Sequence, residues 1–157
     1  MLAAFTRSWI STLVAVIAAL SGARYAAVLN AIEEAHRAIE ESPPDGKMGI
    51  RHTFEPAETL VKLVCNSTKV QRLGAGEIRE HLSPIVARLY PAPPAIASAA
   101  GKMLTAASGW VDAAHPFRHG QNVETPLVVP IELAVAMMGT GASLIRWLAE
   151  IDARVNK

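Results

Sequence analysis

Apolar residues recur at every third or fourth position through several long segments of the chain, and this spacing limits the fold more than any other feature. The clearest stripe runs through residues 95–114 and consists of Ile96, Ala100, Met103, Leu104, Ala107, Trp110, Val111 and Ala114. A period near 3.6 residues brings such positions onto one face of an α-helix. No segment alternates apolar and polar residues for long enough to predict a strand. The sequence therefore predicts an all-α protein, a helical bundle of five to seven helices.

The same reasoning locates the main helices at about residues 6–22, 24–41, 53–72, 95–114 and 129–154. The segment "SPPDGKMG" at 42–49 holds two prolines and two glycines, which disfavour helical hydrogen bonds and helical dihedral angles. We therefore expect two units. Residues 1–48 would form an N-terminal helical hairpin, a flanking or dimerisation element, and residues 49–157 would form the main helical bundle.

Prolines further along the chain indicate where helices begin and end. Thr53 and Glu55 are expected to open a helix that holds Pro56 in its first turn. Ser83 followed by a proline predicts the start of a short helix. Pro116 is expected to end the helix at 95–114, because the residue before a proline is pushed out of the α region.

Composition narrows the possible functions. The 157 residues suffice for one domain with a sizeable core, supplied mainly by alanine and aliphatic residues because only 5% are aromatic. A net charge of +1 gives no global field that would attract nucleic acid or anionic lipid, so RNA binding would need a local patch. The single Cys65 excludes an internal disulfide and a multi-cysteine metal site, and its apolar neighbours predict a buried, inert thiol.

Two apolar segments leave a membrane-associated protein as an alternative. "WISTLVAVIAALSGA" at 9–23 could be a signal or anchor, but Trp9, Leu13, Val16, Ile17 and Leu20 form one stripe, which favours a packed helix. We expect the mature chain to begin at residue 1 or 2 and the protein to be cytoplasmic. The alternative is a small membrane-associated helical protein with spans near 9–29 and 127–146.

The last helix, at 129–154, is the most apolar of the predicted helices. One of its sides nevertheless carries a narrow and weakly polar strip made of Glu132, Ala136, Gly139, Ser143, Arg146 and Glu150. Such a strip predicts a central bundle helix that is buried on most of its circumference, in preference to a membrane span. Its small residues could also be covered by a second chain, so we expect a homodimer.

The segment "DAAHPFRHGQ" at 112–121 is the candidate functional site. Arg118 and His119 are adjacent, and they suit the binding or cleavage of a phosphodiester because arginine holds phosphate and histidine moves protons near neutral pH. Asp112, His115 and Gln121 are further candidates for binding. A metal is not expected, because Pro116 separates the two histidines and no further ligands are nearby; nor does any motif predict a cofactor. The alternative is structural: the histidines cap the helix that precedes them.

Several pieces of the chain, taken in order, carry a resemblance to a known family. They are "FEPAETLVKLVC", "IVARLY", "AAGKMLTAASGWVDAA", then "HG" at 119–120, and "ELAVAMMGTGASLIRWLAEID". From residue 53 onward this series resembles the C-terminal domain of abortive-infection (Abi) proteins, a branch of the HEPN superfamily of helical domains. The resemblance implies a HEPN-like core, homodimerisation, antiphage defence, and RNA or a defence-system partner protein as ligand.

The resemblance also bears on catalysis. Many members of that superfamily are metal-independent ribonucleases with a motif of an arginine, four to six residues, and a histidine. His119 matches the histidine, but the arginine should fall at residues 112–114, where the chain has Asp112, Ala113 and Ala114. Arg118 is the nearest arginine. The resemblance therefore implies RNA or partner binding with a degenerate nuclease motif, with an active ribonuclease that uses His119 and Arg118 as the alternative.

Overall fold

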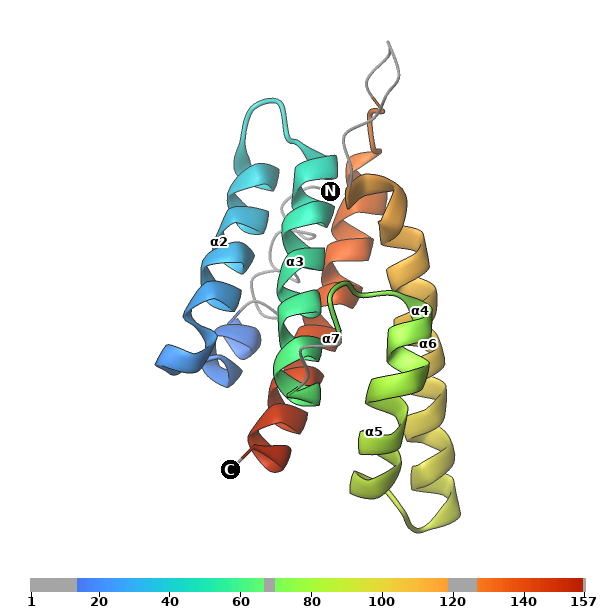
Figure 1. The fold of residues 1–157 in the computed structure, drawn as a ribbon. Coiled ribbons are helices and arrows are strands. Elements are labelled where there is room, and N and C mark those ends of the chain that lie inside the picture. The colour runs from blue at the N-terminus through green and yellow to red at the C-terminus, as the bar shows by residue number, and fades with distance from the viewer. Residues whose placement is uncertain (1–13, 67–69, 119–126, 157) are drawn as a thin grey trace.

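The chain folds into a bundle of helices. The computed structural model describes residues 14–66, 70–118 and 127–156. Within these residues it has six complete α-helices besides the helical residues 14–19, and no strand, which confirms the predicted all-α bundle (Figure 1). The helices are α2 (Ala26–Glu40), α3 (Gly46–Cys65), α4 (Ala75–Glu77), α5 (Ser83–Leu89), α6 (Pro94–Arg118) and α7 (Ile131–Val155). A 3-10 turn precedes α2 at Ala23–Tyr25, and a π-helical turn joins α4 to α5 at Ile78–Leu82.

Helix α3 lies at the centre of the bundle. It packs against α2, α6 and α7, and Figure 1 shows α2 on one side of it and α6 with α4 and α5 on the other. Its buried face consists of Gly46, Gly49, Ile50, Thr53, Phe54, Pro56, Ala57, Leu60, Val61 and Val64. We predicted α7 as the central helix. The structure gives that position to α3, because α3 is covered from three directions.

The start of α3 corrects the predicted helix at 53–72. The helix begins at Gly46, where the carboxylate of Asp45 caps it by accepting a hydrogen bond from the backbone N–H of Met48 at 2.9 Å. The two glycines of "SPPDGKMG" lie inside the helix because of packing. A Cβ on Gly46 would stand 2.9 Å from the Cβ of Ala134, and one on Gly49 would stand 2.7 Å from the sulfur of Met138. Hence only the part of this segment up to Asp45 lies between helices, and residues 46–49 belong to α3.

The end of α3 also differs from the prediction. The helix stops at Cys65, and Asn66 takes the left-handed conformation with φ 42°. Asparagine tolerates this conformation better than most residues, because its short amide can bond locally. The boundary predicted at residue 72 was therefore several residues too late. Val70 and Leu73, which follow the helix, are buried in the common core.

Two prolines lie inside helices that they were expected to open or close. Pro56 is buried in the middle of α3, and α6 continues through Pro116 to Arg118. A proline inside a helix removes one backbone hydrogen bond, here to His52 or Asp112, and costs about 3 kcal/mol. The long buried faces of α3 and α6 offset that cost. The prediction that Pro116 ends the helix was wrong.

The N-terminal segment joins the same core. Residues 14–19 are helical, and Val16 and Leu20 are buried, as the predicted stripe requires. Ile17 is 38% exposed and therefore lies at the edge of that stripe, while Trp9 and Leu13 lie outside the described residues. Tyr25 of the 3-10 turn and Val28 of α2 also enter the core, so the N-terminal segment and α3 share one hydrophobic cluster.

Helix α7 combines a buried face with the predicted exposed strip. Glu132, Ala136, Ser143, Arg146 and Glu150 are exposed, and Gly139 is half-buried. In the part of the chain that the structure describes, α7 is the one helix long and apolar enough to cross a membrane, with a mean hydropathy of 1.3. In the bundle it lies against α3 and buries residues such as Met138, Ile145 and Leu148. The structure thus places α7 as a packed helix of the bundle.

Candidate functional site

The predicted site lies at the C-terminal end of α6. Asp112, His115 and Arg118 occupy successive turns of this helix, because α6 continues past Pro116. The part of the segment up to Arg118 is therefore helical, where a loop was expected. His119 and Gln121 lie outside the described residues.

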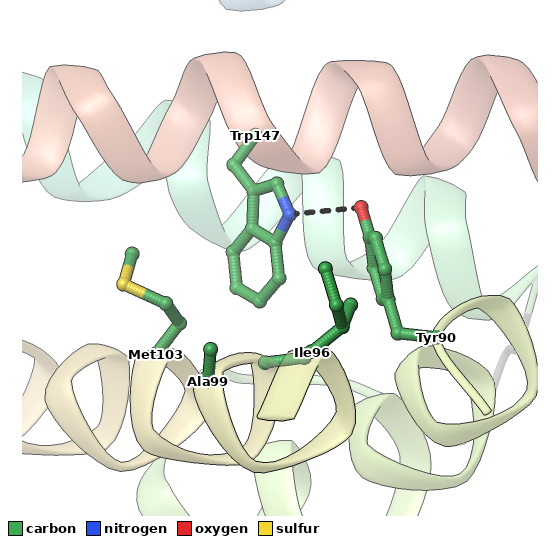
Figure 2. A pocket seen from close by; sticks show the side chains of 6 residues that line it. Tyr90, Ile96, Ala99, Met103 and Trp147 are labelled. Carbon is green, nitrogen blue, oxygen red and sulfur yellow. Dashed lines mark hydrogen bonds between the residues drawn. The ribbon is translucent and has the colours of Figure 1, made fainter. Parts of the chain in front are cut away.

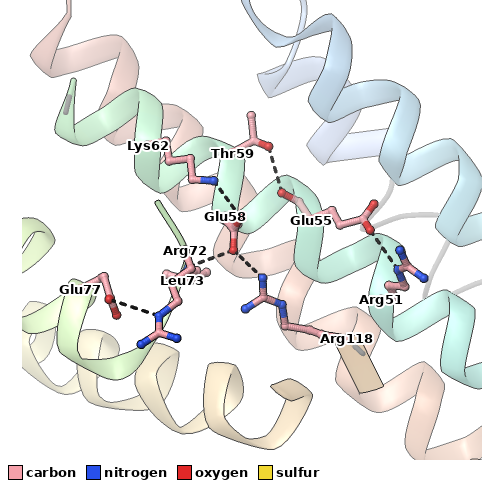
Figure 3. A network of polar contacts seen from close by, with 9 residues as sticks. All are labelled: Arg51, Glu55, Glu58, Thr59, Lys62, Arg72, Leu73, Glu77 and Arg118. Carbon is pink, nitrogen blue, oxygen red and sulfur yellow. Dashed lines mark hydrogen bonds and ion pairs between the residues drawn. The ribbon is translucent and has the colours of Figure 1, made fainter. Parts of the chain in front are cut away.

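Arg118 points inward and joins α6 to α3 (Figure 3). Its Nη2 donates to Oε2 of Glu58 at 2.8 Å, and only 18% of its side chain is exposed. The guanidinium also lies 4.2 Å from the ring centroid of Phe54, a cation–π contact. Phe54 in turn stacks on Trp110 of α6, with ring centroids 5.8 Å apart. The arginine therefore clamps the end of α6 onto the central helix.

Glu58 is the acceptor at the centre of this network. Its carboxylate accepts hydrogen bonds from Nζ of Lys62 at 2.8 Å and from the backbone N–H of Leu73 at 2.9 Å, besides the one from Arg118. Burial by itself would raise the pKa of Glu58. The hydrogen bonds from Lys62 and Leu73 and the nearby positive charges outweigh burial and lower the pKa below its ordinary value. Glu58 is therefore ionised at neutral pH and holds Arg118 as a charged pair.

Sequence reasoning missed Glu58 as part of this site. It stands in the quoted piece "FEPAETLVKLVC", sixty positions before Arg118. The available signal was a glutamate beside the buried Ala57, with Lys62 one helical turn later. That signal indicates a charged pair at the edge of a buried face. It does not indicate a partner on another helix.

The other basic residues of this network are also paired. Arg51 lies 3.1 Å from Glu55, and Arg72 lies 4.0 Å from Glu77 (Figure 3). Each arginine and lysine in the figure thus has a carboxylate partner, which reduces the positive potential that phosphate would meet. In the described part of the network, the charges of the basic and acidic side chains therefore nearly cancel.

The remaining candidates on α6 are accessible. Asp112 and His115 are exposed on the two turns that precede Arg118. A ligand at this end of the bundle could therefore contact them without rearrangement of the core. Within the described residues, no group of three or more histidine, cysteine, aspartate or glutamate side chains is placed to hold a metal ion.

Cys65 lies at the other end of α3 from the Asp45 cap. It is half-buried, and burial raises the pKa of its thiol. A raised pKa keeps the group protonated at neutral pH and makes it a poor nucleophile. This agrees with the predicted inert thiol, although the side chain is less buried than expected.

Comparisons with protein-family models, with curated proteins and with solved structures find no match for this chain. The class that the fold and the site define is a helical bundle in which a paired arginine fixes the end of α6. The assignment to a family therefore depends on the resemblance of the quoted sequence pieces.

Replacing Arg118 with alanine should lower the free energy of unfolding by about 1–2 kcal/mol, because a part-buried charged hydrogen bond and a cation–π contact are lost together. Lys102→Ala is the matched control: Lys102 is an exposed basic residue on the same helix. Its replacement should change stability by less than about 0.5 kcal/mol. Urea unfolding followed by circular dichroism measures both. Equal stability of the two variants would show that Arg118 does not act as a clamp.

Proposed function

We propose that this chain is a HEPN-like helical domain of the abortive-infection type, cytoplasmic and active in antiphage defence. It binds RNA, or a defence-system partner protein, at the C-terminal end of α6. Its nuclease motif is degenerate, so it does not turn RNA over efficiently. The binding residues are His119 and Gln121 with the exposed Asp112 and His115, and Arg118 holds the end of α6 that carries Asp112 and His115.

The observation that carries the proposal is the Glu58–Arg118 pair at 2.8 Å. It connects the helix "FEPAETLVKLVC" with Arg118, which directly precedes the "HG" pair in the sequence. The pair also fixes the backbone from which His119 follows directly.

The same pair supports binding in preference to cleavage. A catalytic arginine must direct its N–H donors at the charge that develops on the phosphate. The guanidinium of Arg118 is instead engaged by Glu58 and covered on one face by Phe54. No arginine stands at residues 112–114 to replace it. Phosphate would have to compete with a carboxylate that is already ionised.

Homodimerisation is part of the proposal. The exposed strip of α7 has Ala136, Gly139 and Ser143 between Glu132 and Arg146. Two copies of α7 packed antiparallel around Gly139 would bring Glu132 of each copy near Arg146 of the other. Small residues at the centre would allow close approach of the helices. Light scattering should give a mass that rises from one chain to two with concentration.

The proposal is tested with fluorescein-labelled single-stranded RNA and no added metal. We expect measurable binding, seen as anisotropy, that weakens as salt is added. His119→Ala should bind the RNA at least about tenfold more weakly, and no appreciable cleavage should occur. Glu58→Gln is the matched variant, because it keeps the shape of the side chain while releasing Arg118. If Arg118 can reach phosphate once it is freed, this variant should bind RNA about threefold more tightly or better.

Three results would change the conclusion. Turnover of the RNA by the unaltered chain, abolished in His119→Ala, would establish the active ribonuclease instead. Absence of RNA binding in every variant would remove RNA as the ligand and leave the partner protein. Recovery of the protein only from membranes would favour the membrane-associated alternative, in which α7 leaves the bundle.

A further inference from the structure

A second feature of the molecule lies at the opposite end of α6 from Arg118. There α5, α6 and α7 surround an open cavity of about 220 Å³ (Figure 2). Its walls are made of Tyr90, Ile96, Ala99, Ala100, Met103 and Trp147. Figure 2 shows Trp147 extending from α7 toward the side chains of α6.

The cavity exists because α6 and α7 are in close contact at one level and apart at another. At the level of Gly141, an added Cβ would stand 2.5 Å from the ring of Trp110, so the helices are tightly packed there. Nearer the start of α6, Ile96 and Met103 are 48% and 51% exposed. Both belong to the predicted apolar stripe of α6. Large apolar side chains left uncovered beside a concave apolar surface are typical of a site for another molecule.

The polar atoms at the cavity are already paired with each other. Nε1 of Trp147 donates a hydrogen bond to the hydroxyl of Tyr90 at 3.3 Å. The remaining walls are aliphatic. A nucleobase placed here would bury donors and acceptors without partners, which costs free energy. An apolar side chain has no donor or acceptor to leave unpaired, so the cavity favours a protein ligand over RNA.

The charges around the cavity indicate which residues of the ligand should flank its apolar side chain. The guanidinium of Arg154 lies 5.1 Å from the ring centroid of Tyr90, and the exposed Lys102 lies on α6 one helical turn after Ala99 of the cavity wall. None of the lining residues is acidic, and Glu150, the nearest carboxylate along α7, is paired with Arg146 at 3.3 Å. The rim is therefore cationic and complements acidic residues of a ligand.

We infer that this open cavity, a groove between α6 and α7, binds an amphipathic helix of a partner protein. One or two large apolar side chains of that helix, spaced three or four residues apart, enter between Ile96, Met103 and Trp147, and acidic residues on its flanks meet Lys102 and Arg154. The inference stands apart from the proposed function, because the groove and the end of α6 at Arg118 are separate surfaces.

The test uses a designed helical peptide of about four turns with leucines along one face and glutamates on the flanks. Binding is followed by the NMR signal of the ¹³C-labelled methyl group of Met103 in the full chain. A second peptide, with lysines in place of the glutamates, is the matched ligand. We expect the acidic peptide to shift the Met103 signal and the basic peptide to bind at least about tenfold more weakly.

Variants test the location. Met103→Glu lacks the methyl probe, so its binding is measured by the anisotropy of fluorescein-labelled peptide. It should weaken binding of the acidic peptide at least about tenfold while leaving the melting temperature nearly unchanged, because Met103 is half exposed. Leu133→Glu is the control, a substitution at a similarly exposed apolar residue of α7, 47% exposed and not part of the cavity wall. The Leu133→Glu variant should bind the acidic peptide as tightly as the unaltered chain does.

Three outcomes would overturn the inference. They are equal binding of both peptides, a Met103 shift caused by single-stranded RNA but not by the acidic peptide, and self-association of the chain that Met103→Glu abolishes. The last would show that a second copy covers the groove. A failure of RNA binding at the other end of α6 would leave these measurements unaffected.

Discussion

Replacing Gly141 with alanine should lower the free energy of unfolding by about 2 kcal/mol, although alanine is the better helix former. The added Cβ would lie 2.5 Å from Cζ2 of Trp110 and 2.6 Å from Cγ2 of Thr53. Neither neighbour can move away easily. Trp110 donates a hydrogen bond to the carbonyl of Met137 at 2.8 Å, and Thr53 donates one to the carbonyl of Gly49 at 2.8 Å. The strain must therefore be taken up by the spacing of α3, α6 and α7.

Gly109→Ala provides the matched control for this prediction. Gly109 lies in α6 beside Trp110, and a Cβ there would meet no atom within 4 Å. Alanine should stabilise the chain at this position by about 0.5–1 kcal/mol, because it restricts the unfolded chain and favours helix. Chemical unfolding of both variants checks the prediction. Destabilisation by Gly109→Ala, or stabilisation by Gly141→Ala, would contradict the packing described at this junction.

The helices could be predicted from the sequence because their apolar stripes are long. Of the predicted stripe of α6, Ala100, Leu104, Ala107, Trp110, Val111 and Ala114 are buried, whereas Ile96 and Met103 are 48% and 51% exposed. The boundaries of the helices were less predictable, because single residues near them are small to allow close packing between helices. Gly46 and Gly49 indicated a break when considered in the sequence alone. In the fold they allow α3 to approach α2 and α7 closely.

The candidate site was predicted less well than the fold. Adjacent Arg118 and His119 suggested a loop that is free to meet phosphate. The structure instead shows Arg118 in a helix and paired with a glutamate from another helix. The identity of that partner depends on how α6 packs against α3. No local pattern around either residue carries this information, since the pair is separated by sixty positions.

Asp152 is the second residue for which we expect a large effect. It is 1% exposed and accepts hydrogen bonds from Arg24 at 2.7 and 3.0 Å, from the hydroxyl of Tyr25 at 2.7 Å and from the amide of Asn156 at 2.7 Å. These contacts join the end of α7 to the turn before α2. Asp152→Ala leaves the buried hydroxyl of Tyr25 without its acceptor and should lower the free energy of unfolding by about 2–3 kcal/mol.

The titration of Asp152 makes part of this stability depend on pH. Burial alone would raise the pKa of Asp152, but the hydrogen bonds from Arg24, Tyr25 and Asn156 and the charge of Arg24 together lower it below the ordinary value of 3.8. Burial and the bond to Asp152 also raise the pKa of Tyr25 to about 12, so Tyr25 remains a donor throughout the acid range. A carboxylate whose folded pKa is depressed contributes stability above its unfolded pKa and loses it as the pH falls through the folded pKa.

The unaltered chain should therefore lose stability steadily as the pH falls below about 4, and Asp152→Asn should lose less over the same interval because its amide does not titrate. Glu150→Gln is the control. Glu150 belongs to an exposed pair with Arg146, in which both side chains are more than half exposed, so this variant should keep the acid dependence of the unaltered chain. Urea unfolding between about pH 7 and pH 2.5 measures all three proteins. If the curve for Asp152→Asn ran parallel to that of the unaltered chain, the acid sensitivity would have to come from other carboxylates, with Glu58 the first to examine because its pKa is also lowered.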